Sequence, residues 1–234
     1  MHFRRIKNVL QTLLNPIFPK SCFGCEALLV KGEKILCAFC RHELPLSGYH
    51  FGVENNMDKA LYGRFEFKKA AALFFYNKEG ILKHCLQYLK YRKQDQISYF
   101  LGLWHAQILK KDPFFPVLDF IIPVPLHPKK KRKRGYNQLN GYGEALSQVL
   151  GVPFLENAVI KTANTKTQTR KNRGLRFLSD STLFKLRDSH IFNDKKILLI
   201  DDVMTTGATL EQFSSAFKGC ESSSFYIVTL AFVP

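Results

Sequence analysis

Two adjacent carboxylates followed by a run of small residues are the part of this sequence with the clearest chemical content. Asp201 and Asp202 follow the apolar run 197–200 and precede a short loop and a helix-like segment that contain Thr205, Thr206, Gly207, Ala208 and Thr209. Carboxylates accept hydrogen bonds from sugar hydroxyls, and a glycine loop that opens a helix presents backbone N–H groups to a phosphate. Ligands of open α/β sheets bind where strand ends meet helix starts. The segment therefore predicts a site for a ribose 5-phosphate.

Two other kinds of phosphate-binding loop are excluded by the sequence. It contains no G-x-x-x-x-G-K-[ST] segment, and no G-x-G-x-x-G segment follows a first strand. One alternative stays open, namely an ordinary strand–loop–helix turn in which the Asp and Thr side chains only cap the helix.

Four of the six cysteines lie within 19 residues and form two C-x-x-C pairs, Cys22 with Cys25 and Cys37 with Cys40. Two such pairs supply the four tetrahedral ligands of a structural zinc site, which leaves no open position for water. The alternative is two disulfides, which would require an oxidising compartment. Because we find no export signal in the sequence, we favour structural zinc.

A basic run follows the predicted strand 118–125. It consists of Lys129, Lys130, Lys131, Arg132, Lys133 and Arg134. Three interpretations remain: a solvated loop, a nucleic-acid contact with Tyr136 and Tyr142 as stacking aromatics, and a polyphosphate contact within the sugar-phosphate site. The net charge of +16 favours a polyanionic partner in general. A second basic turn at 90–93 extends this surface or caps a helix.

The composition excludes several classes of protein. A hydrophobic content of 46% is too high for a disordered chain. No apolar run reaches the roughly 18 residues that a membrane-spanning helix needs. The apolar residues near the N-terminus are instead spaced as in a short amphipathic helix docked on the domain: Phe3, Ile6, Leu10, Leu13 and Leu14. We therefore expect a cytoplasmic protein with no membrane span.

Strands that alternate with helices must position these residues. We predict strands at 63–67, 70–76, 118–125, 158–161, 196–200 and 225–232, and helices at 81–89, 96–109, 139–150 and 209–217. This alternation indicates an α/β fold with a mostly parallel sheet covered on both faces. Residues 47–59 are interpreted as a connection. The chain divides into residues 1–50, with the N-terminal helix and the zinc module, and residues 60–234.

The segment 197–210 closely resembles the binding signature of type I phosphoribosyltransferases, which bind phosphoribosyl pyrophosphate (PRPP). Three further stretches, together with the four cysteines, resemble the ComF family: 122–128, 134–138, and 165–169 with Arg173 and Arg176. This family joins a small zinc-ribbon-like module to a sheet of the type I phosphoribosyltransferase kind. The resemblance runs from about residue 10 to residue 234.

The resemblance implies a role for each matching residue. Asp201 and Asp202 become the catalytic pair that holds the ribose hydroxyls, and residues 205–209 become the 5-phosphate loop. The strand end that faces pyrophosphate is Pro123, Val124 and Pro125. A flexible loop that closes over the site is implied to contain Gln168, Arg173 and Arg176. Ser179 is a departure, because relatives often carry Asn there.

The resemblance also implies an activity and partners. The protein would bind PRPP with Mg²⁺, transfer the phosphoribosyl group to a nitrogen nucleophile and act in DNA uptake during natural transformation. The alternative is a competence factor without enzymatic activity that binds single-stranded DNA and uses the PRPP site only as a ligand switch. Single-stranded DNA and DNA-uptake proteins are the implied partners in either case.

Overall fold

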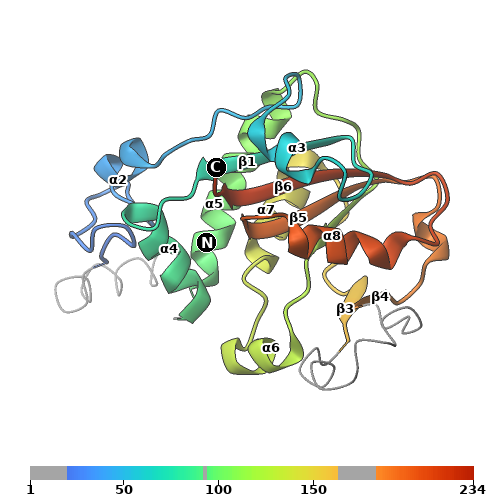
Figure 1. Ribbon diagram of the computed structural model, residues 1–234. Coiled ribbons are helices and arrows are strands. Elements are labelled where there is room, and N and C mark those ends of the chain that lie inside the picture. The colour runs from blue at the N-terminus through green and yellow to red at the C-terminus, as the bar shows by residue number, and fades with distance from the viewer. Residues whose placement is uncertain (1–19, 92–93, 163–182) are drawn as a thin grey trace, which may run out of the picture.

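The computed structural model describes residues 20–91, 94–162 and 183–234 (Figure 1). Its centre is a four-stranded parallel sheet in the order β1 (Lys69–Phe75), β6 (Ser224–Phe232), β5 (Lys196–Met204) and β2 (Phe120–Pro123). The central strands are almost continuously apolar because both faces of the sheet are covered. The α/β fold and the parallel sheet expected from the sequence are thereby confirmed.

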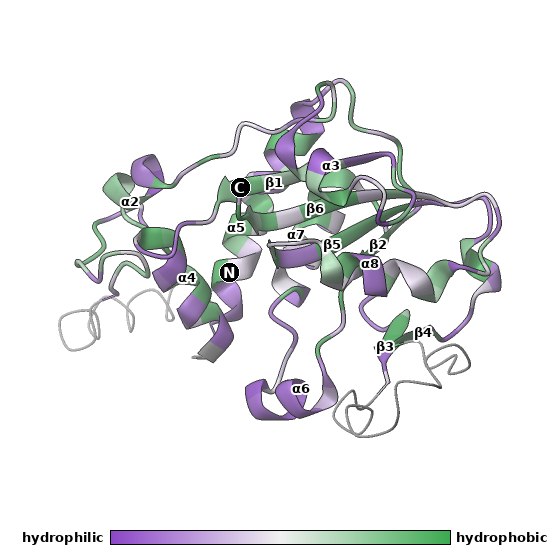
Figure 2. Cartoon of the chain, in the orientation of Figure 1, coloured by the Kyte–Doolittle hydropathy of each residue, from purple (hydrophilic) through white to green (hydrophobic). Residues whose placement is uncertain are grey.

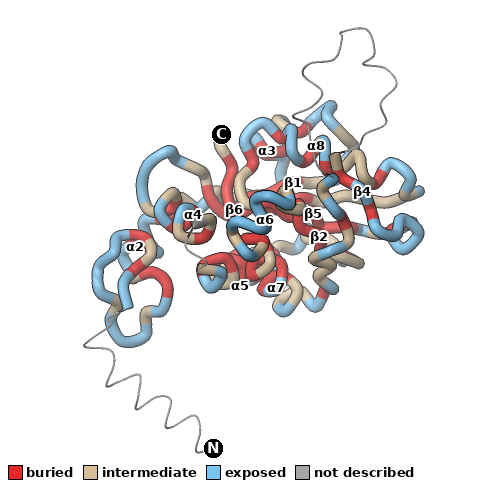
Figure 3. The backbone as a smooth tube through the Cα atoms, turned by 90° about the horizontal axis from the view of Figure 1, so that it is seen from below, coloured by how far each residue is buried: buried red, intermediate tan, exposed pale blue. Residues whose placement is uncertain are grey.

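Helices cover the two faces of this sheet (Figures 1 and 3). On one face lie α5 (Asp95–Lys111) and α7 (Asn140–Leu150), and on the other lie α3 (Asn56–Leu61) and α8 (Ala208–Ser214). A further helix, α4 (Ile81–Tyr91), follows β1 and leads into α5. Two short 3₁₀ turns, η2 (His190–Phe192) and η3 (Ser215–Phe217), are also present.

A small hairpin and a polar helix lie beside the main body. The hairpin pairs β3 (Val159–Lys161) with β4 (Phe184–Leu186) in antiparallel fashion. The polar helix α6 (Pro128–Arg134) contains the whole basic run and has no buried residue. Its hydrophilic colour contrasts with the apolar strands of the sheet in Figure 2. The basic run therefore forms a helix, so the interpretation as a loop is wrong. Pro128 lies at the first position of this helix, and Gly135 ends it.

Two predictions about residues 47–67 are also wrong. Residues 63–67 form no strand, because the chain turns at Gly63 (φ +74°) and pairs with the sheet only from Lys68 onward. The helix α3 begins within the supposed connection 47–59, and its first turn is closed by a capping box between Asn55 and Asp58. The predicted N-terminal helix and the loop with Gln168, Arg173 and Arg176 lie outside the described residues.

The four-cysteine module packs against α4 and α5. The ring of Phe23 meets the ring of Tyr88 edge-on with centroids 5.2 Å apart, and the hydroxyl of Tyr88 donates to Glu26 at 2.6 Å. Arg41 in α2 (Ala38–Glu43) lies over the ring of Trp104 at 5.7 Å. Much of the rest of the module is exposed (Figure 3), so it has little apolar core of its own.

Candidate functional site

The carboxylate pair lies where β2 leaves the sheet. Pairing between β2 and β5 ends at Pro123 and Ile200, whereas β5 continues beside β6 as far as Met204. Asp201 and Asp202 are therefore the first residues of β5 beyond its register with β2. This is the carboxyl end of a parallel strand, the position at which open α/β sheets bind ligands.

Asp202 is held by hydrogen bonds from three directions. The ammonium of Lys90, in the last turn of α4, lies 2.9 Å from Oδ2, and the amide of Gln138 donates to the same oxygen at 3.0 Å. The backbone N–H of Val203 donates to Oδ1 at 2.8 Å. These contacts fix the carboxylate and favour its ionised form.

The two carboxylates have opposite protonation preferences. Burial raises the pKa of Asp201 well above its usual range, and the neighbouring charge of Asp202 raises it further. Burial acts in the same direction on Asp202, but the charge and hydrogen bond of Lys90 and the amide of Gln138 lower its pKa overall. The pair therefore favours one charged and one neutral carboxyl group, because two charges so close together in a buried site repel.

The small-residue loop follows at once and is accessible. Thr205, Thr206, Ala208 and Thr209 are exposed, and Gly207 between them is buried with φ +76°. A Cβ added at Gly207 would lie 2.7 Å from the Leu61 side chain, which is closer than side-chain carbons approach. The position therefore requires glycine for both its backbone conformation and its space.

Arg64 is a cation beside this loop that the sequence analysis missed. Its Cδ lies 3.5 Å from where a Cβ of Gly207 would stand, and its guanidinium pairs with Glu211 at 2.9 Å. Only the packing of α3 and its following turn against α8 brings this arginine to the loop, so no local pattern points to it.

The predicted pyrophosphate strand end reaches the same place. Pro123 and Val124 are buried, Pro125 is half-buried, and the N–H of Val124 donates to Ile200 at 2.9 Å. The side chain of Asn137 donates to the carbonyl of Val124 at 3.4 Å. The strand end is therefore next to the carboxylates.

A basic groove of about 420 Å³ lies between α6 and the β3–β4 hairpin. Four of its lining residues are cations, namely Lys131, Arg132, Lys161 and Arg187. Its acidic lining residue, Glu156, pairs with Lys131 at 3.5 Å. Burial lowers the pKa of Lys161 and the charge of Lys130 lowers it further, whereas Asp201 raises it. Lys161 thus lies in the groove and is influenced by the charges of both α6 and Asp201.

Of the two tyrosines near the basic run, Tyr142 is not available for stacking. Tyr142 is fully buried, and its hydroxyl lies 2.6 Å from Nδ1 of His105. Tyr136 is half-buried, and its hydroxyl donates to the carbonyl of Leu89. Because Tyr142 is part of the α5–α7 core, the expectation that both tyrosines could stack on bases is wrong for this residue.

The four cysteines form one cluster. Their sulfurs all lie within 4.8 Å of one another, and those of Cys25 and Cys37 are 3.7 Å apart. The edge of a tetrahedron with Zn–S bonds of about 2.3 Å is about 3.8 Å, whereas a disulfide would need about 2.05 Å. Backbone N–H groups of Gly24 and Cys37 donate to the sulfur of Cys22, each at 3.3 Å, which favours its thiolate form. The donor set and its spacing therefore fit zinc, and the cysteines are not bonded to one another.

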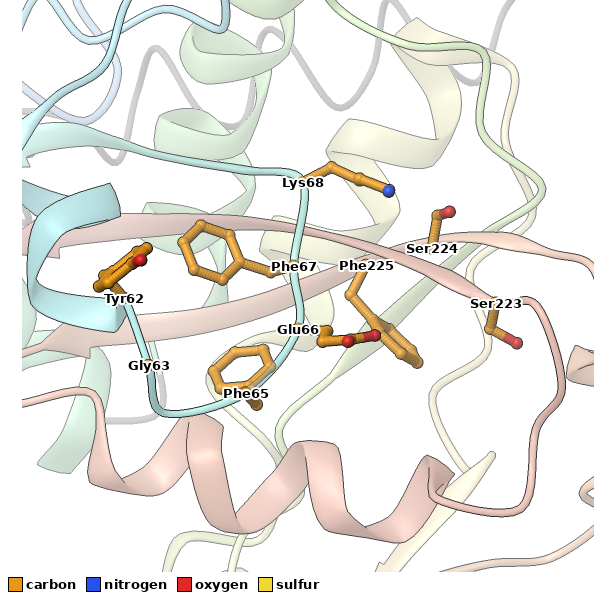
Figure 4. A pocket seen from close by; sticks show the side chains of 9 residues that line it. All are labelled: Tyr62, Gly63, Phe65, Glu66, Phe67, Lys68, Ser223, Ser224 and Phe225. Atoms are coloured by element: carbon orange, nitrogen blue, oxygen red, sulfur yellow. The ribbon is translucent and has the colours of Figure 1, made fainter.

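A larger hollow of about 610 Å³ lies away from the carboxylates. It is lined by the turn that was predicted as a strand and by the start of β6, and Figure 4 shows its aromatic side chains, which are Tyr62, Phe65, Phe67 and Phe225. Because it lies at the amino ends of β1 and β6, this hollow is at the opposite end of the sheet from Asp201 and Asp202.

None of the described helices has the length and the apolar character that crossing a bilayer demands.

Comparison with known proteins agrees with this arrangement. Residues 142–234, which contain the carboxylate pair and the loop, match the family described as phosphoribosyl transferase domain. Competence protein F of Haemophilus influenzae is 36% identical over 101 residues, which are 43% of this chain and 44% of that protein. Competence protein ComFC of Bacillus subtilis is 24% identical over 214 residues, 89% of this chain and 84% of that protein. ComFC of Streptococcus pneumoniae is 34% identical over 94 residues, 40% of this chain and 39% of that protein.

The match thus spans less than half of the Haemophilus and Streptococcus proteins and most of the Bacillus one. Four findings agree with this similarity: the family match, the relatives, the parallel sheet and the four-cysteine cluster. The chain is therefore similar to the ComF/ComFC competence proteins, and its residues 142–234 match the phosphoribosyl transferase domain family.

Proposed function

We propose that the chain binds PRPP with Mg²⁺ at the carboxyl end of β5 and transfers the phosphoribosyl group to a nitrogen nucleophile. The observation that most supports this is the position of Asp201 and Asp202 directly before the exposed loop 205–209 and beside the end of β2. A carboxylate pair next to an exposed loop with backbone N–H and hydroxyl groups suits a sugar that carries a phosphate.

Each part of the site has a role in this proposal. Asp201 and Asp202 hold the ribose hydroxyls, residues 205–209 hold the 5-phosphate, and Pro123, Val124 and Pro125 face the pyrophosphate. The loop role that the resemblance implies for Gln168, Arg173 and Arg176 concerns residues outside the described part of the chain. Mg²⁺ arrives with PRPP and neutralises the charge of the departing pyrophosphate.

A titration followed by a turnover assay on one preparation tests this proposal. Calorimetry with PRPP and Mg²⁺ should give saturable binding, and Asp202→Asn should weaken it. Pyrophosphate release would then be measured with a panel of bases, amines and ammonia. Binding without turnover would reject catalysis and keep the ligand site, and absence of binding would reject the whole proposal.

A second function is favoured by α6. Lys129, Lys130, Lys131, Arg132 and Lys133 are all exposed on one short helix, and the groove beside it adds two cations from the hairpin. We infer that this surface binds single-stranded DNA, in line with relatives that are called competence proteins. Phosphates are the ligands that such a charge excess attracts. In this alternative the PRPP site only switches DNA affinity, and DNA-uptake proteins are the partners.

We further propose that Cys22, Cys25, Cys37 and Cys40 hold one structural zinc ion. Zinc bound to such a site contributes on the order of 10 kcal/mol to folding, which a module with little apolar core requires. Four reduced thiols also fit a cytoplasmic protein. On this basis we assign residues 1–50 to the N-terminal helix and zinc module, and residues 60–234 to the phosphoribosyltransferase-like domain.

A further inference from the structure

The contacts of Asp202 leave it little capacity for further hydrogen bonds. An ionised carboxylate has about four acceptor positions. One is taken by the N–H of Val203 at 2.8 Å, and two are taken by Lys90 at 2.9 Å and Gln138 at 3.0 Å. About one position is left for a hydroxyl of a ligand, so the surrounding donors decide in which direction Asp202 can accept.

Gln138 is itself oriented by a cation. Its Oε1 accepts from the guanidinium of Arg134 at 2.6 Å, while its Nε2 donates to Asp202. An amide with a cation on one side and a carboxylate on the other is stable in one orientation only, since the flipped amide would present like charges to both neighbours. Gln138 is only 4% exposed, so water does not replace either contact easily.

The backbone around Gln138 is fixed by the preceding residues. Gly135 ends α6, and the side chain of Asn137 accepts from the N–H of Leu139 at 3.2 Å and donates to Val124. The turn therefore ties the end of α6 to the end of β2 and holds Gln138 above β5. The side-chain donors to Asp202 come from two separate places in the fold, the last turn of α4 and this turn.

We propose that Lys90, Gln138 and Arg134 are the positioning residues of the sugar site, which hold Asp202 as an oriented, ionised acceptor for a ribose hydroxyl. The inference rests on the proposed PRPP site and adds the residues that determine how its charged carboxylate is presented. A purely structural ion pair is the competing explanation. The two explanations differ in how ligand binding should depend on pH.

Substitutions at Lys90 and Gln138 test the proposal in the full-length protein. Lys90→Met and Gln138→Met should each weaken binding of PRPP with Mg²⁺ by about tenfold or more, because each removes a hydrogen bond to a charged group. Both should also raise the pKa of Asp202, so binding should be lost at a higher pH on acidification than in the parent protein. Lys90→Arg, which keeps the charge, should restore most of the affinity.

Arg134→Met should reproduce part of the effect of Gln138→Met, and the two changes together should cost little more than Gln138→Met alone. Gln138→Glu should be worse than Gln138→Met, since it places a second charge against Asp202. Gln107→Met and Lys111→Met are matched controls, because both side chains are exposed on α5. The other titratable groups near Asp202, namely Asp201 on β5 and Lys161 on β3, stay unchanged in every variant.

Three results would decide the matter. Unchanged affinity in the Lys90 and Gln138 variants would overturn the proposal, and so would an equal loss at every pH. If the parent protein did not bind PRPP, the proposed function would fail separately. A double-mutant cycle on the unfolding free energy of Lys90→Met and Asp202→Asn would then decide, because zero coupling overturns the assigned contact and clear coupling supports it.

Discussion

Asp201 and Asp202 are neighbours in the chain, yet their side chains have different hydrogen-bond partners and opposite protonation preferences. Asp202 accepts from Lys90 and Gln138, whereas the Oδ1 atom of Asp201 accepts only the N–H of Asp202, at 2.8 Å, among the hydrogen bonds described. A ligand with two adjacent hydroxyls can donate to the charged group and exchange a hydrogen bond with the neutral one. An asymmetric pair is therefore as suited to a ribose as two charged groups would be.

Replacing each carboxyl by an amide should separate these roles. We expect Asp202→Asn to weaken PRPP binding by about 10- to 100-fold, because a charged acceptor is lost. Asp201→Asn should have a clearly smaller effect near neutral pH, since the amide resembles the neutral carboxyl group that burial already favours. Calorimetric titration of both variants checks this, and equal losses would contradict the asymmetry.

The same pair predicts how stability depends on pH. The pKa of Asp201 is raised on folding, so its contribution to stability is present below the ordinary pKa of about 3.9 and is lost as the pH rises above it. Asp201→Asn removes this loss, and we expect a higher unfolding free energy than in the parent protein at neutral pH. Asp202→Asn should do the opposite, because the lowered pKa of Asp202 stabilises the fold above that pH. Urea unfolding at acidic and neutral pH measures both.

Gly207 offers a test of the loop. Gly207→Ala forces a side chain into a left-handed backbone conformation and against Leu61, and we expect a cost of about 1–3 kcal/mol in unfolding free energy together with weaker PRPP binding. Gly219→Ala is the matched control, because nothing lies within 4 Å of its added Cβ and its φ is not in the left-handed range. Equal stability of the two variants would show that the loop tolerates a side chain.

At the scale of elements, α4 connects the cysteine cluster to the carboxylate pair. Cys85 and Tyr88 of this helix contact Phe23 and Glu26 in the module, and Lys90, two residues after Tyr88, reaches Asp202. One helix of 11 residues therefore touches both places. A change in the packing of the module against α4 should therefore alter ligand binding at the proposed sugar site.

We expect Tyr88→Ala to keep zinc bound and to weaken PRPP binding several-fold, because it removes the ring contact and the bond to Glu26 without touching a sulfur. Hydrogen exchange should speed up in α4 and stay unchanged in α7. Tyr99→Ala, in α5, serves as the comparison, since Tyr99 contacts Gln148 on α7 instead of the module. Unchanged exchange in α4 would rule out the connection.

The elements differ in how well the sequence predicts them. The buried strands and the longer helices have a periodicity that is set by their own residues, so β5, β6, α4, α5 and α7 follow from the pattern. The strand-like alternation at 63–67 is misleading, because a strand also needs a partner, and here the rings line a hollow instead. The site, too, can be predicted only in part from the sequence. The carboxylates and the loop are contiguous, whereas Gln138 is 64 residues from Asp202 and meets it only through the fold.

At the scale of the whole molecule, the cations behind the net charge of +16 differ in whether they are paired with carboxylates. Some cations are committed to carboxylates, as Lys90 is to Asp202 and Lys69 to Asp58. The five lysines and arginines at 129–133 are exposed, and Lys131 has a distant partner in Glu156 at 3.5 Å. Within the described residues, α6 therefore carries the longest run of consecutive exposed cations.

Replacing Lys129, Lys130 and Lys133 by Ser should reduce binding of labelled single-stranded DNA and flatten its salt dependence. For each phosphate contact that is lost, the slope of log affinity against log salt should fall by about 0.7. Lys110 and Lys111 replaced by Ser, at the end of α5, provide the control. A slope that does not change would move the DNA contact elsewhere.

Metal removal should separate the two parts of the molecule. We expect about one zinc per chain by elemental analysis, and Cys22→Ser with Cys25→Ser should abolish it. Proteolysis should then cut residues 20–46 first, because metal binding supplies their folding energy, while the sheet keeps its own apolar core. A variant without zinc that resists proteolysis throughout would contradict the structural role of the metal.

The strand order has a consequence for synthesis of the protein. β1 begins at residue 69, but its partner β6 begins at residue 224 and lies between β1 and β5. At about 5–20 residues per second, a ribosome needs roughly 8–30 s to deliver the strand that β1 must pair with. Throughout that interval the nascent chain carries an apolar strand with no neighbour, while the four cysteines of the module have already been synthesised. Chaperones that shield exposed strands during translation should therefore matter more to this protein than its modest length suggests.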